Sequence, residues 1–386
     1  MNYSIKHTPK WLYVLVLCSA GINVVSQGFI MIPLDNTLIV HFHIHKDIVY
    51  LSSSIFSIFY AFGFLFFAPL ANQFGKKKII VLGLISLSIC TLTLGFCNIF
   101  SIFLFLRALQ GFVAATYTPL ALAYTFELFT PKNQGKIIGL LSTSFTMSSI
   151  LGQLLSSWFM SHYAFPILFY SFAFILFFSS IILYLILPTT TELPKPLSIT
   201  YWAEMFSLFH NRNLLVSYVV TFTQFLSFVA IYSSLHHLLM QTYRMTNHEI
   251  LLFQCLGIIA MCISPFITNF MSKVGAKKMI TLGLTLTCVG TILFIAGTNI
   301  YLLSITNILF VGGISIVLPA IIFHIGHNSG ERKGVAMALY TFTLFLGSSL
   351  GPYIGAKMNF EYVSLTIFFI LSITLLASRY LEQKYL

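Results

Sequence analysis

The chain has 386 residues, of which 58% are hydrophobic and only 8% are charged, and its mean hydropathy is +0.92. Soluble domains carry about 25% charged residues, so this composition excludes a water-soluble globular protein and indicates an integral membrane protein. The net charge is +11. Because the basic residues stand in short turns between apolar runs, they are expected to orient the chain in a membrane rather than to bind nucleic acid.

Twelve apolar runs have about the 20 residues that a membrane-spanning helix needs. The first begins at Trp11 and lacks a clear small-residue cleavage site, so it is expected to be a span rather than a signal peptide. The predicted spans cover residues 11–34, 48–70, 79–97, 101–126, 135–158, 164–187, 212–239, 248–270, 279–298, 301–325, 334–356 and 361–380.

The basic residues predict the orientation of these spans. Sixteen of the 20 Lys and Arg residues lie at one set of span ends, three (Lys46, Arg244 and Lys357) lie at the other, and Arg107 lies inside a span. Positive charge accumulates on the cytoplasmic side, and an even number of spans returns the chain to its starting side. Both termini are therefore expected in the cytoplasm.

The segment between the sixth and seventh spans is expected to be a cytoplasmic linker. Pro194 and Pro196 break helix, and residues 201–209 can form a short helix at the membrane surface. The side chains expected to face the lipid boundary in this helix are Trp202, Met205, Phe206 and Phe209.

One stretch occurs twice, 200 positions apart: FGKKKIIVLGL at 74–84 and VGAKKMITLGL at 274–284. Gly75, Lys77 and Gly83 of the first copy return as Gly275, Lys277 and Gly283 of the second. A repeat of this length indicates two similar halves. Both halves contain an even number of spans, so they are expected to point the same way in the bilayer, with a path between them.

The residues after the second span, Ala68-PLANQFGKKK, resemble the loop 2–3 signature of the major facilitator superfamily. Small Ala68 allows close helix packing, Gly75 allows a tight turn, and Lys76 to Lys78 hold that turn in the cytoplasm. The acidic position of the signature is occupied by Asn72. Because an amide carries no full charge, the gating interaction made by this position is expected to be weaker than is usual in the family. The second copy has Ser272 there.

The fourth span contains Arg107-ALQGFVAA, which resembles the family's RxxQG motif. Gln110 lies three residues after Arg107 and therefore shares its helix face. A buried arginine is costly unless it is paired or hydrated. It is either a cation that lines the cavity and senses substrate or protons, or a structural residue that bonds neighbouring carbonyl groups.

Further signals lie at the end of the fourth span and in the tenth. Glu127, just before the cytoplasmic turn, is expected to pair with Lys132 or a loop lysine in a structural or gating role. Pro119 has its repeat partner at Pro319, and both prolines are expected to kink their helices.

Carboxylates at membrane depth are limited to Asp35, near the outer end of the first span. Asp35 is either a group that loads and releases a proton as its surroundings change or a helix-end residue that faces water. The first span also presents Asn23 and Gln27 on one face, as a cavity-lining helix does.

Cysteine and histidine give no metal site. The six cysteines lie in apolar runs without a C-x-x-C pair and are expected to be buried small hydrophobes. Alternating His41, His43 and His45 can bind Zn or Cu if their loop is extended, but no cysteine or second carboxylate joins them. Near the outer end of the seventh span, His236 or His237 can titrate close to neutral pH.

The resemblance covers nearly the whole chain and is strongest to the 12-span drug:proton antiporter and small-molecule efflux group. It implies an all-α membrane protein of the major facilitator fold, with 12 transmembrane helices in two pseudo-symmetric six-helix halves. The halves would be residues 1–187 and 211–386, joined by the linker 188–210. It implies no enzymatic activity, no cofactor, and a monomer in the bacterial cytoplasmic membrane.

The function implied is proton-coupled export of a small organic molecule, such as a drug, a metabolite or a siderophore-like chelator, by alternating access. Uptake of a nutrient or organic anion bound by Arg107, and a sensor without transport activity, are the alternatives. Spans one, four and seven line the central path in this family. The resulting substrate and coupling candidates are Asn23, Gln27, Asp35, Arg107, Gln110, Gln224 and His237; the gating and structural candidates are Ala68, Asn72, Gly75, Lys76, Lys77, Glu127, Gly275 and Lys277.

Overall fold

A computed structural model describes residues 9–188, 200–268, 274–297 and 299–381, which fold into helices without a strand in those ranges. Ten helical segments of this described part are long and apolar enough to cross a membrane. They are Leu51–Ala71 of α3 (Leu51–Phe74), α4 (Lys76–Leu94), Phe100–Leu128, Asn133–His162 of α7 (Pro131–His162), α8 (Phe165–Ile186), α10 (Arg212–Gln241), α13 (Ala276–Ala296), α14 (Ile300–Asn328), Lys333–Gly355 of α15 (Lys333–Lys357) and α16 (Phe360–Ser378).

Two shorter apolar helices stand where the first and eighth spans were predicted. They are α1 (Lys10–Ser26) and the stretch His248–Cys262 of α11 (Asn247–Thr268). The prediction of one continuous helix over 11–34 is wrong. After Ser26 the chain forms a turn, then the short helix η1 (Ile32–Leu34) and the separate helix α2 (Asp35–Phe42). Pro33 has no N–H for a continuing helix, and hydrogen bonds such as Gly28 N to Val25 O tighten the turn.

The two repeat-related prolines behave differently. Before Pro119 the fourth predicted span breaks into α5 (Phe100–Ala114) and α6 (Thr118–Leu128), and Pro119 stands in the first turn of α6, where its missing N–H costs little. Pro319 instead stays inside the uninterrupted helix α14. The sequence predicted a kink at Pro119, and the structure has a turn at residues 115–117 between α5 and α6, within the apolar segment Phe100–Leu128.

The repeated basic turns share one backbone conformation. Gly75, between α3 and α4, has φ +90°, and Gly275, before α13, has φ +88°. Residues with a Cβ atom rarely adopt such a positive φ, so both turns require glycine. Farther along α4, a Cβ at Gly83 would lie 1.9 Å from Thr116 Oγ1, so this glycine lets α4 pack directly on the α5–α6 break.

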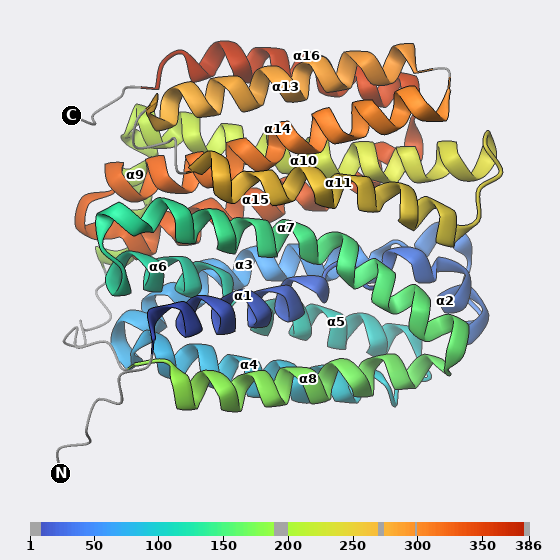
Figure 1. The fold of residues 1–386 in the computed structure, drawn as a ribbon. Helices are drawn as coiled ribbons and strands as arrows, with labels where there is room; N and C mark the ends of the chain where they lie inside the picture. The colour runs from blue at the N-terminus through green and yellow to red at the C-terminus, as the bar shows by residue number, and fades with distance from the viewer. Residues whose placement is uncertain (1–8, 189–199, 269–273, 298, 382–386) are drawn as a thin grey trace.

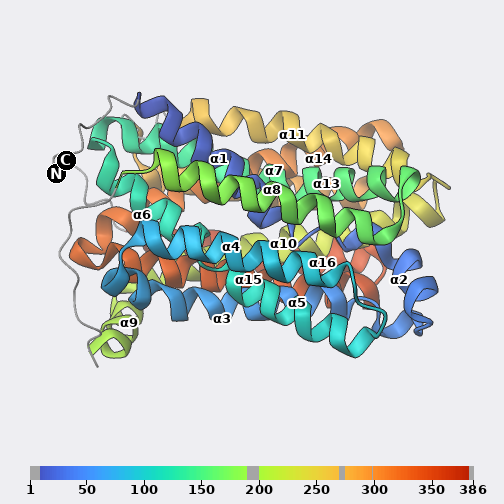
Figure 2. The same ribbon diagram turned by 90° about the horizontal axis from the view of Figure 1, so that it is seen from below.

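Figure 1 shows α1 to α8 gathered in the lower part of the molecule and α10 to α16 in the upper part. The two groups meet where α3 packs on α15 and α7 packs on α11. Helix α9 (Thr200–His210) lies at one end of the long helices and α2 at the other, in both Figure 1 and Figure 2. These are called below the α9 end and the α2 end.

Helix α9 confirms the short helix predicted after the linker prolines, which themselves lie outside the described residues together with the side chain of Trp202. The predicted lipid-facing surface is partly wrong. Phe206 is exposed, but Met205 is buried together with Leu208. Arg332 in the short helix η3 (Gly330–Arg332) donates a 2.6 Å hydrogen bond to Ser207 Oγ. The helix is thus packed on the protein rather than lying free at the surface.

Candidate functional site

A cavity of about 230 Å³, called below the larger cavity, lies between the two groups of helices toward the α2 end. Its residues come from both groups: the turn after α1, η1, α2, the short helix η2 (Lys46–Ile48), α3 and α7 on one side, and α10, α11 and α15 on the other. A cavity with walls from both halves of the chain can change its shape when the halves move relative to each other.

The walls of the larger cavity carry both hydroxyl groups and aromatic rings. From α3 and α7 come the hydroxyl groups of Ser54, Ser57 and Ser149, and α10 contributes the rings of Phe228 and Tyr232. These two rings lie 4.6 Å apart, centre to centre, at 34°. A ligand placed here meets both hydrogen-bonding groups and aromatic rings, which suits an amphipathic small molecule.

Besides two tyrosines, four ionisable side chains border the same cavity: Asp35, Lys46, His236 and His237. Asp35 lies in the first turn of α2, outside the helices long enough to span a membrane. Its side chain remains exposed to the cavity, yet the surrounding protein removes enough water to raise the pKa of its carboxyl group to about 6. The carboxyl group can therefore exchange a proton near neutral pH.

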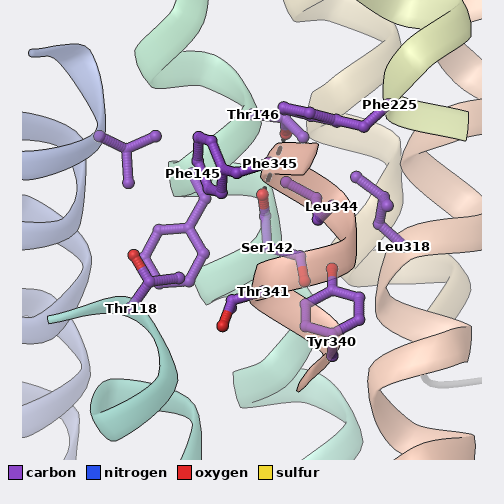
Figure 3. A pocket seen from close by; sticks show the side chains of 11 residues that line it. Thr118, Ser142, Phe145, Thr146, Phe225, Leu318, Tyr340, Thr341, Leu344 and Phe345 are labelled. Carbon is purple, nitrogen blue, oxygen red and sulfur yellow. Dashed lines mark hydrogen bonds between the residues drawn. The ribbon is translucent and has the colours of Figure 1, made fainter. Parts of the chain in front are cut away.

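A smaller cavity of about 30 Å³, shown in Figure 3, lies between α6 and α7 on one side and α10, α14 and α15 on the other. Hydroxyl groups of Thr118, Ser142, Thr146, Tyr340 and Thr341 border it. A space of this size holds a water molecule or two. The Oγ of Ser142 is buried without a hydrogen-bond partner among the described residues, as expected for a group that bonds to water.

The cavities follow the 200-residue repeat. In the smaller cavity, Val25, Thr118 and Phe145 face Phe225, Leu318 and Phe345, their counterparts 200 positions later. In the larger cavity the matching pairs are Gly28 and Phe228, Phe29 and Val229, Ile32 and Tyr232, Ser54 and Gln254, and Ser149 and Ser349. Equivalent positions thus build both sides of the path, and several second-half members are larger or aromatic.

Arg107 is fully buried, but it does not line either of these cavities. Its Nε donates to the carbonyl oxygen of Ser52 (3.0 Å), and its Nη1 donates to the carbonyl oxygen of Gln27 (3.0 Å) and to Gln110 Oε1 (2.5 Å). Its guanidinium carbon lies 4.5 Å from the ring centre of Phe56. Because Gln27 is the residue at which α1 ends, the cation satisfies a helix-terminal carbonyl group.

Gln110 extends this network to a fourth helix. Its Nε2 donates to Gln27 Oε1 (3.0 Å) and to Thr91 Oγ1 (2.8 Å). Three of the predicted candidates, Gln27, Arg107 and Gln110, therefore come together as a buried cluster that joins α1, α3, α4 and α5. This is the arrangement expected for the structural alternative, in which the arginine bonds neighbouring carbonyl groups.

The remaining substrate candidates are scattered. Asp35 and His237 line the larger cavity. Gln224 is buried and donates to Thr287 Oγ1 at 3.4 Å, and Asn23 Nδ2 donates within its own helix to Ser19 O. Neither lines the two cavities.

At the α9 end, Lys76 forms an ion pair with Glu127, so the predicted partner of Glu127 is one of the loop lysines. Lys77 Nζ lies 5.2 Å from the ring centre of Tyr184 at the end of α8. In the second copy, Lys277 Nζ donates to the carbonyl oxygen of Arg379 after α16. The two basic turns therefore hold equivalent helix ends. Ala68 is buried as predicted, and the side chain of Asn72 lies outside the described part.

The alternating histidines do not stand on an extended loop. His41 lies in α2, where its ring contacts Phe42 and Phe165, and His43 ends that helix with φ +53°. Within the described residues, no group of three His, Cys, Asp or Glu side chains is placed to hold a metal ion. Because Asp35–Phe42 is a helix, the extended loop on which the metal site depended is not formed there.

Sequence reasoning missed the serine-rich wall of α3 and the aromatic wall of α10. Isolated serines and phenylalanines are common in membrane helices, so their type alone gave no signal. The repeat offset gave a signal for a different part of the lining, because Ser148 and Ser149 of α7 recur as Ser348 and Ser349 of α15, and three of these four residues line the larger cavity.

A family model described as Major Facilitator Superfamily matches residues 16–352, with a second match over 238–382. An uncharacterised transporter of Buchnera aphidicola subsp. Baizongia pistaciae is 26% identical, over 95% of this chain and 92% of its own. Multidrug resistance protein 2 of Bacillus subtilis is 23% identical, over 95% and 94%. A bicyclomycin resistance protein homologue of Haemophilus influenzae is 24% identical, over 58% of each chain.

The fold has a solved counterpart. The crystal structure of the human organic anion transporter MFSD10 (TETRAN) superposes with a TM-score of 0.82 over 96% of this chain and 100% of that one, at 14% sequence identity. This likeness concerns the fold alone. Together with the family match over most of the sequence, it confirms the predicted fold, and the chain belongs to the Major Facilitator Superfamily, whose members are membrane transporters and not enzymes.

Proposed function

We propose that this transporter exports a small amphipathic organic molecule in exchange for protons, by alternating access between residues 1–187 and 211–386. The observation that carries the proposal is the larger cavity, which takes hydroxyl groups from α3 and α7 and aromatic rings from α10. The family relatives named for multidrug and bicyclomycin resistance support a drug or a metabolite as the exported molecule.

The proposed orientation places the α9 end in the cytoplasm of a bacterial cell, with both termini there and the protein in the inner membrane. The turns at the α9 end carry Lys76 to Lys78, Lys277, Lys278 and Arg332, whereas Lys46, Arg244 and Lys357 stand near the α2 end. The larger cavity then faces the outside, as in the substrate-releasing state of an exporter.

Proton coupling is proposed to use Asp35, which lines the larger cavity. A carboxyl pKa of about 6 lets protons bind from the outside when the cavity is open there. One proton moving through about 100 mV supplies about 2.3 kcal/mol, which sustains roughly a fifty-fold gradient of a neutral substrate.

Uptake of an organic anion held by Arg107 has less support, because this side chain is bonded to Gln27, Ser52 and Gln110 and does not line either cavity. A sensor without transport activity would have no need of a cavity with walls from both halves. The proposed working unit is a single chain in the bilayer, because one chain supplies all the walls of the cavity.

The test compares metabolites in the medium and cytoplasm of cells that produce the parent, Ser349→Trp or Leu350→Trp. Ser349 lines the cavity, whereas Leu350, its neighbour on α15, is exposed on the outer surface. The parent and Leu350→Trp are expected to deplete the cytoplasm of one compound and enrich the medium, and Ser349→Trp is expected to lose this effect. Enrichment in the cytoplasm instead would establish uptake.

The compound identified in this way then tests the coupling. In inside-out vesicles that carry a proton gradient, its addition is expected to release protons, as reported by a pH-sensitive dye. Asp35→Asn is expected to abolish this release. Proton release that is unchanged in Asp35→Asn would remove Asp35 from the mechanism.

A further inference from the structure

The ring of Phe126, near the end of α6, points directly at the backbone of Gly326, near the end of α14. A Cβ added to Gly326 would lie 2.2 Å from Phe126 Cζ and 2.7 Å from Cε1. The aromatic ring therefore occupies the space that any side chain at position 326 would need. This contact joins the two halves of the molecule at the α9 end, opposite the larger cavity.

The two residues occupy the same position in the two repeats, because they are 200 residues apart, as are Gly75 and Gly275. When two like halves are related by a two-fold axis, equivalent positions near that axis meet each other. Two phenylalanines could not share the space that the ring now fills, and two glycines would leave it empty. The ring of Phe126 and the lack of a side chain at Gly326 therefore make the two surfaces complementary.

The surroundings of Phe126 hold its ring in place. His327 presents its ring at 74° with 6.3 Å between centres, and Lys333 Nζ lies 5.4 Å from the Phe126 ring centre. On the first-half side, Gln134 Nε2 donates to the carbonyl oxygens of Phe126 (3.2 Å) and Phe129 (2.9 Å). These bonds fix the backbone at the end of α6, and the contacts with His327 and Lys333 accompany the ring beside Gly326.

We propose that Phe126 and Gly326 form a knob-and-socket lock that holds the α9 end shut while the cavity is open toward the α2 end. Opening of the path at the α9 end withdraws the ring from the glycine. Phe126 and Gly326 are thus positioning residues for the change between the two states, and this inference rests on the alternating access proposed above.

The lock is tested by the distance between two spin labels, which does not depend on any substrate. The labels replace Lys78 and Lys278, exposed and repeat-equivalent residues at the α9 end of the two halves, in a protein whose six cysteines have been replaced. The distance between the labels is measured by pulsed electron–electron double resonance on the purified protein in lipid nanodiscs. Phe126→Gly and Gly326→Phe are each expected to increase the long-distance population by about threefold or more.

The swapped double variant Phe126→Gly/Gly326→Phe is expected to return toward the short distance, because it again pairs one ring with one glycine. The matched control is Tyr170→Gly, which removes a ring from a similarly close contact with Gly95 inside the first half and is expected to leave the distance unchanged. The lock is refuted if Phe126→Gly behaves like the parent, or if the swap is no shorter than Gly326→Phe. A confirmed lock in a protein without export would refute only the proposed function.

Discussion

The guanidinium group of Arg107 holds the carbonyl oxygen of Gln27, the residue at which α1 gives way to a turn. The same group holds Ser52 O at the start of α3 and Gln110 Oε1 on its own helix. One buried cation thus bonds three oxygen atoms where α1, α3 and α5 meet.

Replacement of this cation is expected to destabilise the fold. Arg107→Ala leaves three buried oxygen atoms with fewer donors, and an unsatisfied buried group costs about 1–3 kcal/mol, so a loss of about 3 kcal/mol or more is expected. The control is Arg212→Ala, an exposed arginine stacked on Tyr380, for which about 0.5–1 kcal/mol is expected. Unfolding of the purified proteins by denaturant measures both. Parent-like stability with lost export would instead give Arg107 a direct role in transport.

The glycine turns can be tested by their backbone conformation. Gly75→Ala places a side chain at φ +90°, where a residue with a Cβ is strained by about 1–2 kcal/mol, although no neighbouring atom obstructs the added methyl group. Gly275→Ala is expected to cost a similar amount, because its backbone has the same shape.

Gly312→Ala is the control for these turns. This glycine lies inside α14 with only Ala260 Cβ within 4 Å, at 3.7 Å, and alanine favours a helix by up to about 1 kcal/mol. A rise in the unfolding midpoint for Gly312→Ala together with a fall for both turn variants is expected. Equal effects at all three positions would contradict the argument from φ.

The sequence was sufficient for the features that depend on neighbours along the chain. The spans, the turn at Gly75 and its copy at Gly275 follow from hydrophobic runs and a short repeat. The break after Ser26 was missed because the run through Ile32 remains apolar, and composition does not distinguish a continuous helix from one that turns. The partners of Arg107 and Gln110 were not predictable in detail, because Gln27, Ser52 and Thr91 lie on other parts of the chain that only packing brings together.

The ion pair between Lys76 and Glu127 is expected to link the turn after α3 to the end of α6. Their side chains are 8% and 21% exposed, so a coupling of about 1 kcal/mol is expected from a double-mutant cycle with Lys76→Gln and Glu127→Gln. The charge-reversed pair Lys76→Glu/Glu127→Lys is expected to recover much of the stability that either single reversal loses. Additive losses, with no recovery in the reversed pair, would mean that the pair contributes no coupling.

Asp35 gives the pH dependence of the fold a definite sign. The pKa of its carboxyl group rises from 3.8 to about 6 on folding, so the folded protein holds this proton more tightly than the unfolded chain. Stability is therefore lost as the pH rises from about 4 to about 6, and the loss then stays constant.

The variant Asp35→Asn removes this contribution. Its unfolding midpoint is expected to match the parent near pH 4 and to exceed it above pH 6, in measurements of the purified proteins from pH 4 to pH 8. Glu361→Gln, at an exposed carboxylate in the first turn of α16, controls for the loss of one negative charge at the surface. A constant difference between parent and Asp35→Asn across this range would show that Asp35 does not titrate there, and it would refute the proposed proton site.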